Sequence, residues 1–346
     1  MCLRLCDGAF MSDPLVTIEG LKTHFPLDKG TVQTVDGVDL SVPRGKTLCV
    51  VDESGCGKSI TAFSLMRMLA SPGRIVEGTI TLNHPEGTSV CLTDLAEDGE
   101  QMRAIRGRDI AMVFQEPMTS LSPVHTVGSQ IVEAVRLHMD LDKKGARAHA
   151  VEIMRRVGVP DPERRFGEYP HELSGGLRQR AMIAMALSCR PALLIADEPT
   201  TALDVTIQAQ ILALMRQLQA ELGMAILLIT HDLGVVAQMA HEVAVMYLGR
   251  VVEYGTVQQI FEDPQHPYTQ ALLRSLPGTH IGERKAALAV IEGSVPDPFD
   301  RLAGCPFAPR CREVEVGFCD VGSRPLLVEV SAGHTTACLQ RRGVRR

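Results

Sequence analysis

The stretch that decides the fold is CVVDESGCGKSITAF, residues 49–63. The apolar run at residues 47–51 favours a β-strand, and the apolar spacing of residues 59–69 favours a helix. A glycine-rich S-G-C-G-K-S segment between a strand and a helix is typical of a phosphate-binding loop, and a chance glycine-rich turn is the weaker alternative. The motif G-x-x-x-x-G-K-[ST] has its first glycine replaced here by Asp52.

The loop supplies groups suited to binding phosphate. We expect the backbone amides of residues 54–60 to point inward at the N-terminus of the helix. Lys58 is expected to reach the β- and γ-phosphates of a nucleotide, and the Ser59 hydroxyl to ligate Mg²⁺. The residues expected to contact the nucleotide in this loop are Ser54, Gly55, Cys56, Gly57, Lys58, Ser59 and Ile60.

Asp52 is the departure from the motif, and two costs bear on it. If its φ is positive, a residue with a Cβ costs about 1 kcal/mol. A carboxylate that faces a triphosphate adds a repulsion of about 1 to 4 kcal/mol. The first glycine does no phosphate chemistry itself, so an outward rotation of Asp52 leaves the essential groups intact. We therefore predict nucleotide binding that is weakened but survives.

Two later apolar runs also end in residues that can act on a phosphate. PALLIADEPTTALD (191–204) places Asp197 and Glu198 at a strand end, and AILLITHD (225–232) does the same for His231. One acid can hold Mg²⁺, the next can accept a proton from an attacking water, and the imidazole can contact the γ-phosphate. Each signal alone is weak, because acids often cap strands and a lone His is commonly a surface or core residue. Together they predict one site at the carboxyl edge of a parallel sheet.

Two further segments lie between these strands. Gln115 closes a short apolar run and could join the metal or the water, although a lone Gln is usually a polar loop residue. The stretch LSGG (173–176) predicts a second helix N-terminus suited to an anion, with Ser174 as the N-cap and Gly175 and Gly176 allowing close backbone approach. The chain thus offers two phosphate sites.

The composition limits the class of protein. The 346 residues are 45% apolar and 22% charged, which fits a soluble chain of one large domain plus an extra unit. The net charge of −6 gives no basic footprint, so a nucleic-acid partner is disfavoured. No apolar run is long enough to cross a bilayer, and the first residues do not resemble a signal peptide, so we expect a cytoplasmic context. We expect residues 1–14 to be a disordered extension, with either Met1 or Met11 as the start.

Ten cysteines are present, and four of them lie in the last 42 residues. These four contain no C-x-x-C spacing, so the usual zinc-ribbon pattern fails, and disulfides would be reduced in the cytosol. Four thiolates could still enclose a tetrahedral Zn²⁺ or a [4Fe–4S] cluster. The other six cysteines are expected to be ordinary buried thiols, with Cys49 in an apolar strand and Cys56 at a variable loop position. The four clustered cysteines are Cys305, Cys311, Cys319 and Cys338.

Taken together, these motifs resemble those of the ATP-binding subunits of ABC transporters over roughly residues 15–345. The resemblance identifies DESGCGKS as Walker A, VFQEP as the Q-loop, LSGGLRQR as the signature, LLIADE as Walker B, TALD as the D-loop and THD as the H-loop. The segments QEPMTSLSPV, HPYTQALLRSLP and IEGSVPDPFDRLAGCPFAPRC resemble the dipeptide and oligopeptide importer branch, whose ATPases carry such a C-terminal extension.

The resemblance implies an α/β fold with a RecA-like P-loop core. The ABC nucleotide-binding domain is expected at 15–255, with an antiparallel β subdomain near 15–50 and a helical subdomain at about 118–190. The C-terminal extension with the four cysteines is expected at 256–346.

In this family two ATPase domains sandwich two nucleotides head to tail, so Ser174, Gly175 and Gly176 would act on the partner's ATP. The resemblance makes Glu198 the base, with Gln115 and His231 sensing the γ-phosphate. It also implies three metal and nucleotide assignments. Ser59, Gln115 and Asp197 would organise Mg²⁺, Asp204 of the D-loop would lie at the nucleotide, and Phe25 would stack on adenine unless it is a plain strand residue. For the four cysteines it favours a [4Fe–4S] cluster over Zn²⁺ or free thiols.

The implied function is import of di- and oligopeptides driven by ATP hydrolysis, at the cytoplasmic face of the inner membrane. The implied partners are two transmembrane permeases, a related but non-identical ATPase and, indirectly, an extracytoplasmic substrate-binding protein. One alternative is a degenerate subunit that only donates its signature, against which the intact Glu198 and His231 argue. Another is an importer of nickel or a different small solute. A soluble ABC protein of translation or DNA repair is disfavoured, because the chain has neither a second cassette nor a long coiled-coil insertion.

Overall fold

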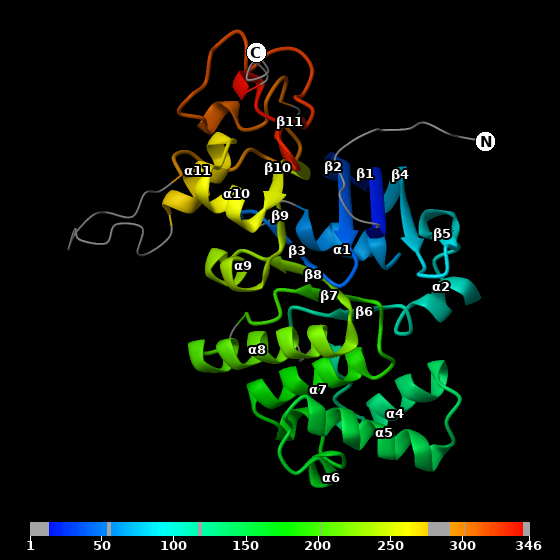
Figure 1. Cartoon of the computed structure of the whole chain (residues 1–346). Helices are drawn as coiled ribbons and strands as arrows, with labels where there is room; N and C mark the ends of the chain where they lie inside the picture. Colours follow the sequence, from blue (N-terminus) through cyan, green and yellow to red (C-terminus); the bar gives the residue numbers. More distant parts are fainter. Residues whose placement is uncertain are drawn as a thin grey trace, which may run out of the picture.

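The computed structural model describes residues 14–53, 57–116, 120–201, 203–275, 291–300 and 302–341. Within these ranges the main sheet has eight strands in the order β11-β12-β10-β9-β3-β8-β7-β6 (Figure 1). Its central strands pair in parallel and are almost entirely buried, as expected for apolar runs covered on both faces. These parallel strands are β3 (Thr47–Val51), β6 (Ile110–Val113), β7 (Leu193–Asp197), β8 (Ala225–Thr230) and β9 (Glu242–Tyr247).

A second, antiparallel sheet stands beside the first and has the strand order β2-β1-β4-β5. Its residues share one hydrophobic core with strands of the main sheet, because Val16, Leu40 and Ile80 cluster with Leu48 and Val50 of β3. This sheet confirms that an antiparallel β subdomain is present, but β4 and β5 extend it beyond the predicted residues 15–50. Its strands are β1 (Pro14–Leu27), β2 (Gly30–Pro43), β4 (Arg74–Asn83) and β5 (Ser89–Cys91).

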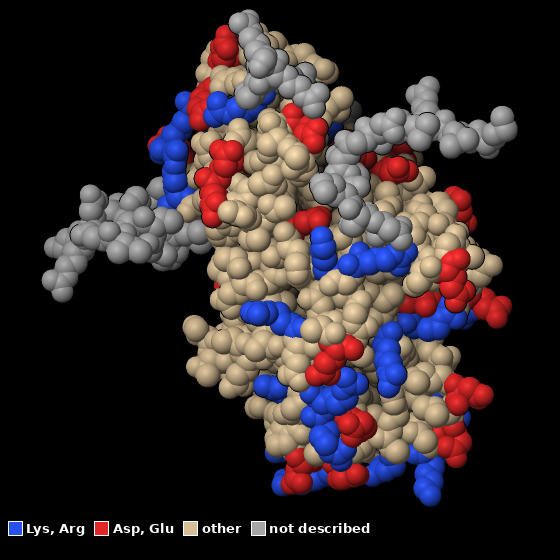
Figure 2. Space-filling view, viewed as in Figure 1, with Lys and Arg blue, Asp and Glu red and all other residues tan. Residues whose placement is uncertain are grey.

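A helical part is inserted between β6 and β7 and lies at the opposite end of the molecule from the C-terminus (Figure 1). Helices α4, α5 and α7 pack on one another through apolar residues such as Ile131, Met154 and Ala181. On the face shown in Figure 2, basic and acidic side chains are interspersed over this part. The helices of the insert are α4 (Val127–His138), α5 (Lys143–Arg156), α6 (Pro162–Arg165) and α7 (Gly175–Leu187). The other helices of the core are α1 (Lys58–Leu65), α2 (Glu100–Ile105), α8 (Val205–Leu222) and α9 (Leu233–Met239).

The C-terminal extension is joined to the main sheet. β12 pairs with β10, so that β11 and β12 lengthen the sheet at one edge. The buried carboxylate of Glu253 on β10 accepts the backbone N–H groups of Gln265 (2.6 Å) and His266 (2.9 Å) and lies 2.8 Å from Nε2 of His334. The extension is therefore held to the core by a buried polar network. Its elements, with β10, are β10 (Arg250–Thr256), α10 (Val257–Glu262), α11 (Pro267–Arg274), the 3₁₀ helix η3 (Ala308–Arg310), β11 (Val328–Ser331) and β12 (His334–Thr336).

Among the residues that the structure describes, no helix has both the length and the apolar character needed to cross a membrane.

Candidate functional site

The junction between β3 and α1 has the order that the sequence predicts. α1 begins at Lys58 directly after Gly57, whose φ of 97° lies in the left-handed region. A Cβ at Gly57 would lie 2.2 Å from the carbonyl oxygen of Thr34, so only glycine fits this close approach. Ile60 is half-buried on α1 and packs on the shared core. The remaining predicted loop residues, 54–56 (Ser54, Gly55 and Cys56), lie outside the described part of the chain.

Asp52 does not rotate outward as expected. Its side chain is buried, and Oδ1 forms an ion pair with Nζ of Lys58, which also lies 3.3 Å from the Asp52 carbonyl oxygen. Neither carboxylate oxygen has another partner of hydrogen-bond geometry among the described residues. Burial raises the pKa of Asp52 to about 7, although Lys58 opposes that rise. Asp52 is also not among the residues with positive φ, so the expected backbone cost is absent. The buried ammonium explains the inward orientation, since a buried charge needs a partner.

The end of β7 lies next to the start of α1. Ser59 Oγ donates a hydrogen bond to Asp197 Oδ1 at 3.1 Å, which places two of the three predicted Mg²⁺ ligands in direct contact. Burial raises the pKa of Asp197. A hydroxyl at the end of the phosphate loop and a carboxylate at the end of β7 form a donor set that suits Mg²⁺.

Glu198 is the point at which the predicted catalytic residues meet. Gln115 Nε2 lies 3.2 Å from Oε2, and His231 Nδ1 lies 3.0 Å from Oε1. Thr201, which the sequence analysis missed, donates its hydroxyl to Oε2 at 2.9 Å. Glu198 has a left-handed φ of 45°, and its N–H donates to the Ile229 carbonyl on β8 at 2.9 Å. Burial alone would raise the pKa of Glu198, but the hydrogen bonds with His231 and Thr201 lower it overall.

The signature segment presents an open helix N-terminus. Ser174 is the N-cap of α7, but its side chain makes no capping hydrogen bond, and both Ser174 and Gly175 are exposed. A Cβ at Gly176 would lie 3.0 Å from the side chain of Ile207, and Asp204 accepts the Ile207 N–H at 2.9 Å as the N-cap of α8. The signature and the D-loop are therefore adjacent in this chain.

Two aromatic residues lie near the β1–β2 hairpin. Phe25 on β1 is half-buried opposite Val32, and a Cβ at Gly73 would lie 2.5 Å from its ring. Phe299 comes from the C-terminal extension and was not predicted. Its ring lies 3.3 Å from the position of a Cβ at Gly30.

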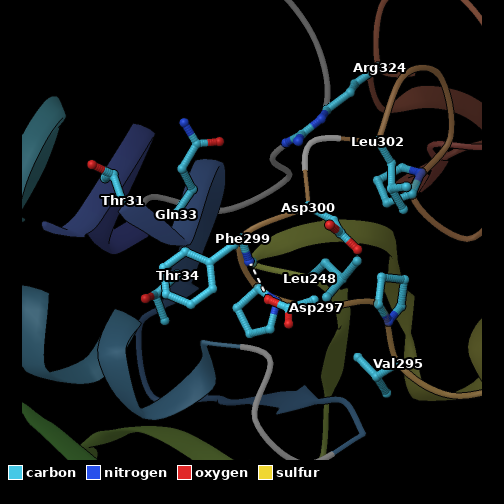
Figure 3. Close-up of a pocket in the computed structure, with 14 residues that line it drawn as sticks. Thr31, Gln33, Thr34, Leu248, Val295, Asp297, Phe299, Asp300, Leu302 and Arg324 are labelled. Carbon is cyan, nitrogen blue, oxygen red and sulfur yellow. Dashed lines mark hydrogen bonds between the residues drawn. The ribbon is translucent and has the colours of Figure 1, made fainter. Parts of the chain in front are cut away.

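Phe299 lines a pocket between β2 and residues 295–306 (Figure 3). Thr34 also lines the pocket, beside Phe299 in Figure 3, and its carbonyl is the group that approaches Gly57. The pocket thus lies beside the Gly57 end of the phosphate loop. Its signal in the sequence was weak, because the aromatic ring stands in a proline-rich segment far from the loop.

The four clustered cysteines come together around one small cavity, which Phe307 and His266 also line. Burial raises the pKa of Cys305 to about 11, and the neighbouring cysteines add to that rise. Backbone N–H groups at residues 307, 313 and 340 donate to Cys305, Cys311 and Cys338 respectively. Within the described ranges, no group of three or more His, Cys, Asp or Glu side chains has metal-binding geometry as it stands.

The remaining cysteines show a mixed pattern. Cys49 is fully buried, and burial raises its pKa, as expected for a thiol in an apolar strand. Cys91 and Cys189 are only half-buried. Cys2, Cys6 and Cys56 lie outside the described residues.

Three features lie at one edge of the sheet: the parallel strand that precedes Gly57 and Lys58, the contact between Ser59 and Asp197, and the side chains that meet at Glu198. Together they define a P-loop ATPase of the ABC class. Residues 35–201 match the family described as "ABC transporter", and residues 252–319 match "Oligopeptide/dipeptide transporter, C-terminal region". The chain belongs to the family of ABC transporter ATP-binding proteins, in the branch that carries the oligopeptide/dipeptide transporter C-terminal region. This membership confirms the resemblance, the ABC ATPase fold and the ATPase class predicted from the motifs.

Similar proteins span nearly the whole chain. The oligopeptide transport ATP-binding protein AppD of Bacillus subtilis is 48% identical over 325 residues, which cover 94% of this chain and 96% of AppD. The dipeptide transport ATP-binding protein DppD of Haemophilus influenzae is 46% identical over 318 residues, which cover 90% of this chain and 93% of DppD. Among solved structures, the dimeric ABC transporter cassette MJ0796 has a TM-score of 0.61 at 23% identity. The match covers 70% of this chain and 98% of the MJ0796 chain. The likeness to MJ0796 supports the fold.

Proposed function

We propose that this chain is the ATP-hydrolysing subunit of an importer of di- and oligopeptides. The observation that carries the proposal is the convergence of Gln115, Thr201 and His231 on the Glu198 carboxylate. A carboxylate held by three side chains at the sheet edge is a suitable base for activating water. The peptide class is supported by the C-terminal region and by the names of AppD and DppD, which describe oligopeptide and dipeptide transport.

Each contact supports a role in hydrolysis. Lys58 would stabilise the β- and γ-phosphates once it leaves Asp52. Mg²⁺ would be held by Ser59, Asp197 and Gln115. Glu198 takes the proton of the attacking water. Mg²⁺ supplies charge neutralisation at the phosphates.

His231 keeps Glu198 oriented and contacts the γ-phosphate, and Phe25 stacks on the adenine. The backbone amides of residues 54–60 cradle the phosphates. With these assignments the site has all the groups that ATP hydrolysis needs, and Asp52 weakens its binding of ATP.

The exposed N-terminus of α7 supports a role in a second site. Because Ser174 leaves its hydroxyl free of an intrahelical bond, the hydroxyl and the Gly175 and Gly176 amides are available to the ATP of a partner ATPase. Asp204, adjacent through Ile207, lies at the same dimer face.

Family membership implies membrane-spanning permeases and an ATPase dimer. We propose two permeases, a related but non-identical second ATPase and an extracytoplasmic binding protein that acts indirectly. The subunit is then peripheral, at the cytoplasmic face of the cell's inner membrane.

The four cysteines around the cavity are of the ligand type that a thiolate-bound metal group needs, although within the described ranges their side chains do not have metal-binding geometry as they stand. Four thiols around one cavity supply a complete ligand set, and the N–H donors to Cys305, Cys311 and Cys338 stabilise thiolate sulfur. We propose a [4Fe–4S] cluster, with Zn²⁺ as the alternative. Burial raises the pKa of Cys305, which favours the thiol form without a metal, so binding of the group releases protons.

The cluster proposal is tested on anaerobically purified protein. Iron, sulfide and zinc are measured for the chain as written, for Cys311→Ser and for the control Cys189→Ser, which lies outside the cavity. The cluster is supported if the original chain and Cys189→Ser each contain four iron and four sulfide per chain and Cys311→Ser has lost them. One zinc per chain selects the alternative, and the absence of both metals refutes a metal role.

The function is tested in the assembled transporter in lipid vesicles. We expect ATP turnover to rise when the binding protein is loaded with a peptide, and no comparable rise with nickel. Stimulation by nickel alone would replace the peptide assignment. Turnover that survives Glu198→Gln but stops in Ser174→Arg would instead identify a signature donor with a silent site of its own.

A further inference from the structure

The C-terminal extension contacts the first residues of the phosphate loop. Nη1 of Arg310 lies 2.7 Å from Oε2 of Glu53, and Nη2 lies 3.3 Å from Oε1, so the guanidinium grips both carboxylate oxygens. The Glu53 backbone N–H donates to the Tyr268 hydroxyl at 2.7 Å. Glu53 follows Asp52 and is the second position of the loop motif. The extension therefore holds both the main chain and the side chain at this point.

Arg310 is itself fixed in place. Its side chain is only 3% exposed, its Nε donates to the Glu292 carbonyl at 3.1 Å, and Nη1 lies 3.4 Å from the Tyr247 hydroxyl. The rings of Phe307, Tyr247 and Tyr268 pack together behind it. A planar guanidinium that is bonded on several sides has one orientation and makes a rigid support.

We propose that Arg310 is a positioning residue of the ATP site, which acts by neutralising Glu53 and holding the start of the phosphate loop. Without Arg310, Glu53 would place an unpaired negative charge beside a loop that binds a triphosphate, and the loop would lose its side-chain anchor. Both effects weaken nucleotide binding and leave the Glu198 hub untouched. The inference rests on the proposed binding of ATP by this loop, which Lys58→Ala tests separately.

The test compares nucleotide binding by the full-length chain with the KM and kcat of the assembled transporter. Arg310→Gln should raise the Kd for a fluorescent ATP analogue and the KM for ATP about tenfold, since a charge-assisted pair is lost. The kcat at saturating ATP should stay within about twofold, because the residues that meet at Glu198 are not altered. Arg310→Lys keeps the positive charge but cannot bond both carboxylate oxygens of Glu53 as the guanidinium does. Its KM for ATP should therefore lie between those of the original chain and Arg310→Gln.

The matched control is Arg312→Gln. Arg312 lies two residues further along the same segment and pairs with Glu292 at 2.8 Å, but both side chains are mostly exposed. Loss of such a surface pair should leave the KM unchanged. A KM that rises equally in Arg310→Gln and Arg312→Gln would overturn the proposal.

The double variant Glu53→Gln, Arg310→Gln separates positioning from folding. If Arg310 acts through Glu53, removing both charges should recover most of the lost affinity. A double variant as weak as Arg310→Gln, or an unchanged KM in Arg310→Gln, would show that Arg310 only supports the extension. If Arg310→Gln fails to fold, Arg310→Lys and the double variant carry the test. Binding that survives Lys58→Ala would instead refute the proposed ATP site.

Discussion

Replacing Asp52 with asparagine should remove a pH-dependent barrier to ATP binding. The Asp52 side chain is 0% exposed and pairs with the Lys58 ammonium, the group that ATP needs. ATP binding therefore removes the cation that stabilises the carboxylate and brings a second anion toward it. Two like charges 4 Å apart repel by about 1 to 4 kcal/mol as the effective dielectric constant falls from that of water to about 20.

Protonation limits this penalty. Because burial raises the pKa of Asp52 to about 7, the carboxylate can take up a proton when ATP arrives. The cost of that proton is about 0.4 kcal/mol at pH 7 and about 1.4 kcal/mol at pH 8, and it vanishes well below the pKa. ATP affinity should therefore be highest below pH 7 and should fall as the pH rises. The Kd for ATP of the unsubstituted chain, divided by the Kd of Asp52→Asn, should be about 1 at pH 6, about 2 at pH 7 and about 10 at pH 8.

The assay is equilibrium binding of a Mg²⁺-bound, non-hydrolysable ATP analogue to the full-length chain between pH 6 and 8.5 at constant ionic strength. The ionisation of the nucleotide itself cancels in the ratio, since both proteins bind the same ligand. Asp52→Gly, which restores the motif, should behave as Asp52→Asn does. A ratio that stays constant over this range, or tighter binding by the chain as written at pH 8, would refute the reasoning.

Two further changes test the catalytic hub and the link to the extension. Glu198→Gln should slow phosphate release at least about 100-fold, the usual contribution of a general base, and leave the Kd for ATP within about twofold; a rate within tenfold of the original would contradict that role. Glu253→Ala should lower the free energy of unfolding in urea by about 3 to 5 kcal/mol, because it leaves two buried backbone N–H groups and the ring of His334 without their partner. A loss below about 1 kcal/mol would show that water or a rearranged side chain satisfies these groups.

The carboxyl edge of the sheet could be predicted from the sequence because its signals are local. The run at residues 47–51 and the runs that end at Asp197 and Thr230 are contiguous, and parallel pairing brings their ends together. Glu198 and His231 follow directly from that placement. The hydrogen bond from Thr201 could have been expected only from knowledge of the loop conformation.

The contacts that the sequence did not reveal join distant parts of the chain. Arg310 and Glu53 are 257 positions apart, and neither lies in a pattern that indicates the other. The inward orientation of Asp52 depends on how deeply Lys58 is buried, which is a property of the packed core and not of the loop sequence. The addition of β11 and β12 to the main sheet was also missed, since both strands are short, β11 is only half apolar and β12 is entirely polar.

Asp52 and Glu53 are consecutive acids that are neutralised in different ways. Lys58, the partner of Asp52, is taken by ATP, whereas Arg310, the partner of Glu53, is buried and fixed. Only Asp52 therefore loses its cationic partner when ATP binds, and the pH dependence of ATP affinity comes from Asp52.

The Glu53 charge also raises the pKa of Asp52, after the larger effect of burial. The pH at which the affinity begins to fall should thus move down in Glu53→Gln. In Arg310→Gln, where the Glu53 charge is no longer balanced, it should move up. The same binding titration measures both shifts, and equal midpoints in the two variants would show that the two acids act independently.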